Sequence, residues 1–342
     1  MTTLSCLVIL SEVEGSLIFP GGPSAEKLEV LRLRFASLRM TRLKTSTRRH
    51  RLSFRLWFLI CVSPVHLAAT EDASALYRQA QELMRREQFA AAIPLLEKCV
   101  AAEPGNSKFH QWLGRAVALE AARNGIVSGA MSVRKVRSEL ERAIELDPLN
   151  LEARQDIAIM YRALPGFLGG SNAKAADQIA FMRRHDPALA AQLEGDFLAA
   201  DKKYDAALTA YNESAKLNPR AMIQVRISLV HQQRKEWENA FAALERALTF
   251  DSSYPLALYQ VGRTAALSGQ LLDRGEKCLR TYIAMPVREE LKNPSLAAAH
   301  FRLGNILEKK GNPAGAREEY ETALRIDPKQ KLAREALAKL KR

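Results

Sequence analysis

The sequence predicts an all-α fold, a solenoid of antiparallel helix pairs, and three observations support this prediction. Ala, Leu, Glu, Arg and Lys are plentiful in the 342 residues, whereas aromatic residues make up only 7%. The plentiful types lose little side-chain freedom in a helix. A short phrase that ends in a small residue recurs seven times, and a proline closes most of these copies. A proline there ends the second helix of a pair and starts the next unit.

The segment before the repeats has the layout of an export signal. A basic stretch from Arg48 precedes an apolar run over Leu56 to Val62 and a break at Ser63-Pro64. This order is typical of a secretory signal peptide, and the small Ala69 predicts cleavage before Thr70. The run is shorter than the roughly 20 residues that span a bilayer. The alternatives are an uncleaved anchor over residues 56–69 or a buried helix.

The residues before Met40 do not fit this layout. A signal peptide that starts at Met40 has an ordinary length, about 30 residues. The run before it resembles the translation of a bacterial intergenic repeat. We therefore expect residues 1–39 to be an extension without function or a start placed too early, residues 40–69 to be the signal peptide, and residues 70–342 to be the solenoid.

The charge pattern argues against nucleic acid as a partner, and the cysteine content argues against a disulfide framework. Beyond residue 69 the chain has 41 basic and 34 acidic residues, a net charge of +7, and the two signs alternate along the expected helix faces. No basic stretch is interleaved with aromatic residues, so nucleic acid is not expected as a partner. Cys99 and Cys278 belong to distant copies, so no disulfide framework is expected.

The internal repeat is defined by small residues. In most copies, a second slim residue follows the small residue that ends the phrase by about twelve positions, and a third follows seven or eight positions later. Gly195, Ala207 and Ala215 are an example. Short side chains let two helices approach to about 8 to 10 Å between their axes. The phrase ends at spacings of 33 to 44 residues, at Ala80, Gly114, Ala158, Gly195, Ser228, Gly262 and Gly304. The closing prolines are Pro104, Pro148, Pro187, Pro219 and Pro328.

This pattern resembles the tetratricopeptide repeat, whose period of about 34 residues covers two antiparallel helices. The resemblance extends from Ala73 to about Gln330 and is clearest in residues 191–219 and 300–328. It implies a right-handed superhelix of about seven repeats, at 73–106, 107–150, 151–187, 188–220, 221–254, 255–293 and 294–330. Residues 331–342 are expected to form a capping helix. An amphipathic helix lying on an acidic membrane is the alternative for them.

Three places depart from the period. Extra residues fall at 121–134 in copy two, at 164–172 in copy three and at 285–295 after copy six, and we expect loops there. Gly169 to Asn172 could cradle a phosphate, but the segment lacks the Walker lysine-serine pair and follows a helix. A left-handed turn with Ser171 or Asn172 as N-cap is the prediction instead. This turn also resembles one in some bacterial periplasmic tetratricopeptide proteins, including ones associated with solute transport.

The sequence does not bring catalytic groups together. The histidines at 110, 185, 231 and 300 lie in four different copies, and neither an HExxH pair nor a GxSxG motif is present. We therefore expect no enzyme activity, no metal and no cofactor.

The resemblance to the family implies a concave groove lined by the first helix of each repeat, which binds an extended peptide or a partner helix. We expect a non-catalytic interaction scaffold, exported to a bacterial periplasm, with membrane contact only if the signal segment stays uncleaved. The alternative is a small-molecule-binding accessory protein of a solute-transport system, which a pocket enclosed by the loops of copies two and three would favour. The groove candidates are Tyr77, Gln81, Gln111, Arg115, Gln155, Gln192, Asp196, Gln232, Tyr259, Arg263, Phe301 and Asn305.

Overall fold

The computed structural model describes residues 9–10, 17–18, 72–124, 126–286 and 294–340. The expected signal peptide at 40–69 lies outside these residues. So does the expected extension at 1–39, apart from two short antiparallel strands, β1 (Ile9–Leu10) and β2 (Leu17–Ile18). All regular structure described between residues 72 and 340 is helical, which confirms the all-α prediction.

Residues 72–340 form seven helix pairs and one final helix, as far as the structure describes them. Each predicted repeat range holds one pair, except that α8 begins one residue before its range, at Pro187. The pairs are α2 (Ala73–Arg85) and α3 (Phe89–Ala102), α4 (Ser107–Asn124) and α5 (Ile126–Leu146), α6 (Leu151–Ala163) and α7 (Asn172–His185), α8 (Pro187–Ala200) and α9 (Tyr204–Leu217), α10 (Ala221–Gln233) and α11 (Trp237–Phe250), α12 (Pro255–Ser268) and α13 (Leu272–Ala284), and α14 (Leu296–Lys309) and α15 (Pro313–Ile326). The final helix is α16 (Lys331–Leu340).

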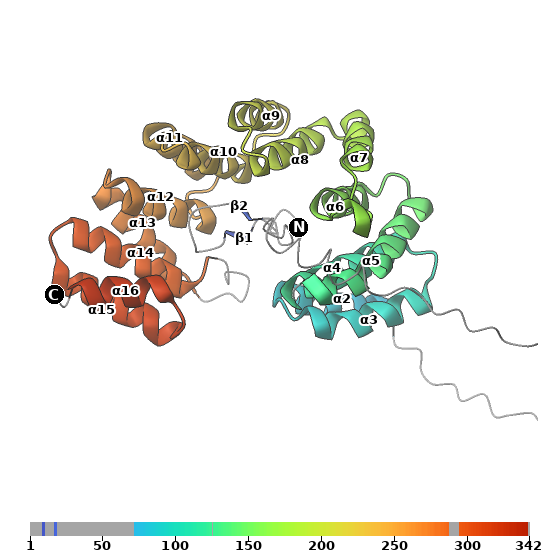
Figure 1. The fold of residues 1–342 in the computed structure, drawn as a ribbon, viewed down its shortest axis with the longest axis horizontal. Coiled ribbons are helices and arrows are strands. Elements are labelled where there is room, and N and C mark those ends of the chain that lie inside the picture. The colour runs from blue at the N-terminus through green and yellow to red at the C-terminus, as the bar shows by residue number, and fades with distance from the viewer. Residues whose placement is uncertain (1–8, 11–16, 19–71, 125, 287–293, 341–342) are drawn as a thin grey trace, which may run out of the picture.

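The helices form a curved array. Each helix packs against the next one in sequence. In addition, α12 contacts both α10 and α14 directly. Figure 1 shows α6, α8 and α10 on the inner side of the arc and α7, α9 and α11 on its outer side. We call the first helix of each pair the inner helix. This sequential packing is the solenoid that the repeat predicted.

The recurring small residues lie where the two helices of a pair meet. Ala80, Ala158 and Ser228 are fully buried. A Cβ added to Gly195 would lie 2.6 Å from the ring of Tyr211, and one added to Gly304 would overlap the ring of Tyr320 in the same way. These contacts confirm the register of the repeat and its physical reason, because only a slim residue leaves room for the opposite ring.

The turn inside a pair has a shared geometry in four copies. Its left-handed residue is Glu87, Lys202, Lys235 or Gly311, with φ between 57° and 76°. Its amide donates to a carbonyl of the preceding helix, as Lys235 does to Gln232 at 3.0 Å. Glycine adopts this conformation without strain, whereas the other three residues do so at a cost.

The irregular copies differ in how they absorb extra residues. The loop predicted over 121–134 is wrong, because these residues lengthen α4 and α5 to 18 and 21 residues, against 13 or 14 in the other pairs. Ala121, Ala122 and Arg123 favour helix, and an antiparallel pair can lengthen without losing its contact. In copy three a turn does form, with a 3-10 segment η2 (Gly166–Leu168), Gly169 at φ +90° and Ser171 as N-cap. Residues 287–293 lie outside the described part.

Candidate partner-binding site

The candidate groove residues lie on the inner helices, but most are less exposed than the sequence suggested. Nine of the twelve are buried: Gln111, Arg115, Gln155, Gln192, Asp196, Gln232, Tyr259, Arg263 and Phe301. Tyr77, Gln81 and Asn305 are partly exposed. The nine buried residues therefore offer a partner little surface in this structure, and the role of all twelve in binding stays a prediction.

Pairing between neighbouring inner helices explains much of this burial. Arg115 on α4 reaches Asp156 on α6, with Nε 2.8 Å from Oδ2, and Gln111 donates to the same carboxylate at 3.2 Å. Burial lowers the pKa of Arg115, but Asp156 and Glu152 outweigh it and raise that pKa above its ordinary value. The long polar side chains of Gln111 and Arg115 thus form hydrogen bonds to the adjacent repeat and not to solvent.

A second buried network links α8, α9 and α10. Asp196 forms an ion pair with Arg226, and the hydroxyl of Tyr211 donates to the same Oδ1 at 2.7 Å. Burial, followed by the Asp196 carboxylate, raises the pKa of Tyr211 well above its ordinary value, so its hydroxyl keeps the proton that it donates. Tyr211 therefore serves both as the ring over Gly195 and as an anchor for Asp196.

Family models identify the repeat. A tetratricopeptide-repeat model matches residues 77–124 and 193–255, and another matches residues 297–330. The chain contains tetratricopeptide repeats. The matched segments include copies four and seven, in which the sequence pattern was clearest.

One solved structure supports the fold of the array, and two others are less similar. Yeast Tom70 is similar with a TM-score of 0.53 at 14% identity, over 83% of this chain and 59% of that chain. Pseudomonas aeruginosa pilF has a TM-score of 0.49 at 16% identity, over 68% of this chain and 97% of that chain. A tetratricopeptide repeat protein from Parabacteroides merdae has a TM-score of 0.48 at 12% identity, over 79% and 99% of the two chains. No curated protein is similar enough in sequence to count as a match.

A hollow of about 710 Å³ lies between α5 of the second tetratricopeptide repeat and the η2 turn of the third. Its wall carries three arginines and three glutamates, among them Arg142 and Glu145, which pair at 3.2 Å. Arg137 donates to the carbonyl of Leu168 at 3.1 Å and lies where any side chain on Gly169 would have to be. The hollow is open to solvent on one side. Gly169 is therefore required by the docking of this turn onto α5.

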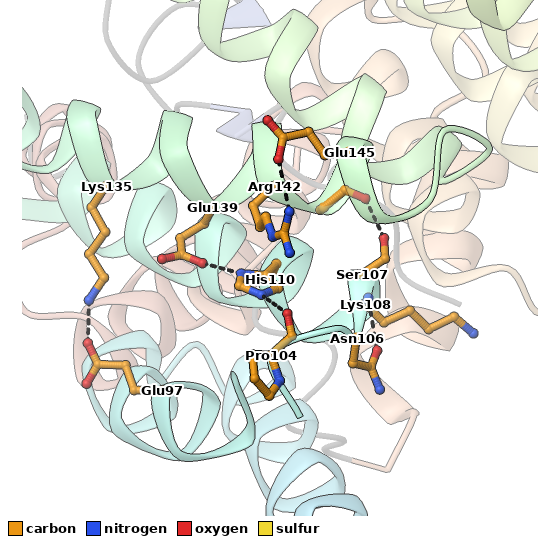
Figure 2. Close-up of polar contacts among 11 residues, drawn as sticks. Glu97, Pro104, Asn106, Ser107, Lys108, His110, Lys135, Glu139, Arg142 and Glu145 are labelled. Atoms are coloured by element: carbon orange, nitrogen blue, oxygen red, sulfur yellow. Dashed lines mark hydrogen bonds and ion pairs between the residues drawn. The ribbon is translucent and has the colours of Figure 1, made fainter. Parts of the chain in front are cut away.

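His110 borders the same hollow and holds two helices together. Its Nδ1 lies 2.7 Å from Glu139 of α5 and its Nε2 lies 3.0 Å from the carbonyl of Pro104, as Figure 2 shows. His231 and His300 also pair with glutamates, Glu236 and Glu319. In the described residues, no three His, Cys, Asp or Glu side chains gather as a metal site would require. Three of the four histidines in the repeats thus pair with a glutamate of their own repeat.

Sequence reasoning missed the acidic and basic partners that lie one repeat apart. Asp156, Arg226 and Arg302 occupy the same position in three inner helices, two residues before the small residue. Asp156 and Arg226 are opposite in charge to their partners Arg115 and Asp196, whereas Arg302 corresponds to another arginine, Arg263. A comparison of successive repeats, position by position, could have found these charges. None of the described helices is both long and apolar enough to cross a membrane.

Proposed function

We propose that the chain is a non-catalytic scaffold of the bacterial cell envelope, which binds a peptide or a helix of a partner protein along its inner helices. The observation that carries this proposal is the continuous row α10, α12 and α14, in which α12 contacts both of the other helices. These helices bear polar and aromatic side chains. Side chains of this row that reach the surface, such as Arg302 and Asn305 of α14, offer hydrogen-bonding groups of the kind that peptide recognition uses.

The export signal predicted from the sequence supports the envelope location. The basic and apolar order of residues 48–70 is the basis for this part of the proposal. Expression of the complete chain in a bacterial host should yield a periplasmic protein that begins at Thr70, as N-terminal sequencing would reveal. A protein that keeps residues 56–69 and sediments with membranes would support the anchored alternative instead.

The binding test blocks the inner helices at both ends of the array. Gln81 and Asn305 are partly exposed there, so Gln81→Trp and Asn305→Trp each add bulk on the proposed surface. Lys98→Trp adds the same bulk to an exposed position of α3. In a pull-down from an envelope extract of the host, the wild type and Lys98→Trp should capture the same protein. At least one inner-helix variant should lose it.

Two results would count against the scaffold. Equal capture by all four proteins would mean that the inner helices are not the binding surface. Turnover of a substrate by the purified chain, with no partner captured, would point to an enzyme. Circular dichroism and thermal melting of each variant show whether a loss of capture reflects unfolding.

The hollow between α5 and η2 favours one second candidate, the small-molecule accessory protein. Its volume of about 710 Å³ lies in the range of ligand sites. However, Arg142 and Arg137 are already engaged by Glu145 and Leu168. A rise in melting temperature with amino acids, sugars or dicarboxylates, abolished by Gly169→Leu, would support this candidate.

A further inference from the structure

A pair of positions recurs between successive inner helices. One is the residue directly after the small residue, and the other lies two residues before the small residue of the next inner helix. Between α4 and α6 these are Arg115 and Asp156, and between α8 and α10 they are Asp196 and Arg226. Both pairs are buried ion pairs. At two interfaces between inner helices, the two recurring positions therefore hold one guanidinium and one carboxylate.

The same two positions between α12 and α14 hold two arginines. They are Arg263 and Arg302, and in the described part of the chain neither forms an ion pair with a carboxylate. Arg263 is only 7% exposed and donates to the side-chain oxygen of Gln232. The Nε of Arg302 is buried without a hydrogen-bond partner. This interface therefore has two donors, where each of the other two has one donor and one acceptor.

Electrostatics distinguishes this place from its equivalents. Burial and then the nearby Arg302 lower the pKa of Arg263 to about 10. At Arg115, by contrast, the two neighbouring carboxylates outweigh burial. A buried cation next to a like charge is costly, and an anion that enters between the two removes that cost.

The remaining interfaces do not share the feature. The corresponding residues are Gln81 and Trp112, Ile159 and Leu193, and Leu229 and Gln260, all uncharged. The excess positive charge at these positions is therefore specific to the last two repeats. Nearby Gln260 adds another buried donor, because its Nε2 has no hydrogen-bond partner.

We propose that Arg263 and Arg302 bind a carboxylate of an acidic segment in the partner protein, an inference that rests on the proposed scaffold function. Planar guanidinium groups match a carboxylate through paired hydrogen bonds. Arg302 is partly exposed, so an aspartate or glutamate side chain can approach it from solvent, whereas the nearby Arg263 is buried. The partner then supplies the acceptor that Asp156 and Asp196 supply at the other two interfaces.

The test uses the full chain and fluorescein-labelled hexaglutamate as the probe. Arg302→Asp recreates within the chain the arginine-aspartate pair of the other interfaces, so it should raise the melting temperature and weaken hexaglutamate binding at least about tenfold. Arg263→Gln should weaken binding to a similar extent. The matched control is Arg325→Asp, the same change at an exposed arginine of α15, which should leave binding within about twofold.

The outcomes separate this site from the scaffold proposal. Loss of anisotropy change in Arg302→Asp and Arg263→Gln, with retention in Arg325→Asp, supports the site. Equal binding by all variants, or no binding by the wild type, overturns it. If the partner captured in the pull-down still binds Arg302→Asp normally, the scaffold stands and the carboxylate site is wrong. A folded Arg302→Asp protein with unchanged affinity would be decisive against it, and Arg263→Gln decides alone if Arg302→Asp fails to fold.

Discussion

At the scale of single residues, charge pairs between repeats hold the inner helices in place. Asp196 accepts from both Arg226 and Tyr211, so one carboxylate ties three helices together. Each partner is buried, and the geometry is therefore worth more to specificity than to net stability. Removing one member exposes the cost of burying the others.

Asp196→Ala is expected to lower the free energy of unfolding by about 3 to 5 kcal/mol, because Arg226 stays buried after losing its counter-charge. The double change Asp196→Leu with Arg226→Met should lose much less, since it removes both charges and keeps the volume. Urea denaturation of Asp196→Leu, of Arg226→Met and of the double variant measures the coupling. Additive losses would show that the two side chains do not act as a pair.

The left-handed turn residues offer a second test at this scale. Lys235 has φ +59° where copy seven has Gly311, so Lys235→Gly should raise the free energy of unfolding by about 0.5 to 1 kcal/mol. Lys235→Ala removes the same side chain but keeps the strain of a Cβ, and it should change stability little. Thermal melting of the two variants provides the comparison. A gain in Lys235→Ala as large as in Lys235→Gly would assign the effect to the lost charge.

Residue by residue, the sequence predicted burial of small and apolar side chains better than that of polar ones. Ala80 and Gly195 were located because their lack of bulk repeats at a regular spacing. The burial of Arg115 was not, because it depends on this side chain reaching across to Asp156 of the next repeat. Such contacts join residues about 40 positions apart, beyond any pattern within one helix.

At the scale of elements, a slimmer small residue faces a larger partner in copies one, four, five and seven, whereas in the irregular copies two and six Gly114 and Gly262 face leucines. Gly195 and Gly304 face Tyr211 and Tyr320, sixteen residues later. In copies one and five, where the small residue is alanine or serine, the residue sixteen positions later is leucine. In these four copies the side-chain volume is thus divided differently between the two helices.

Gly304→Ala should lower the free energy of unfolding by about 1 to 3 kcal/mol, because the added methyl overlaps the buried ring of Tyr320. Adding Tyr320→Leu recreates the combination of copy one and should recover part of that loss. The comparison is the sum of the two single losses against the loss of the double variant, from urea midpoints. If the double variant loses the full sum, the register assigned to the helices is wrong.

Helix ends were predictable where capping chemistry marks them. Pro187 and Pro313 stand in the first turn of α8 and α15, and Asn312 accepts from the amide of Gly315 at 2.9 Å. The course of the insertion in copy two was not predictable from its length. The inserted residues form helix because their helix propensity is high and because both helices of the pair can lengthen together. The spacing of small residues reveals neither property.

At the scale of the whole molecule, each repeat depends on its neighbours. The contacts run between helices adjacent in sequence and between neighbouring inner helices. Stability should therefore follow a sum of local terms, and a change at one end should act mainly there. The final helix α16 is where this property can be measured most directly.

Removal of residues 331–342 should loosen the last repeat and leave the first unaffected. Ala333 is fully buried and Leu337 packs against the cluster that contains Tyr320, so the apolar face of α16 is already used by α15 and is not free for a membrane. Hydrogen exchange should accelerate in α14 and α15, while α2 to α5 keep their protection. Leu337→Asp should reproduce this effect in milder form, and Lys339→Asp, at an exposed position of the same helix, should not. Uniform acceleration along all the helices would instead mean that the array unfolds as one cooperative unit, and α16 would then stabilise every repeat equally.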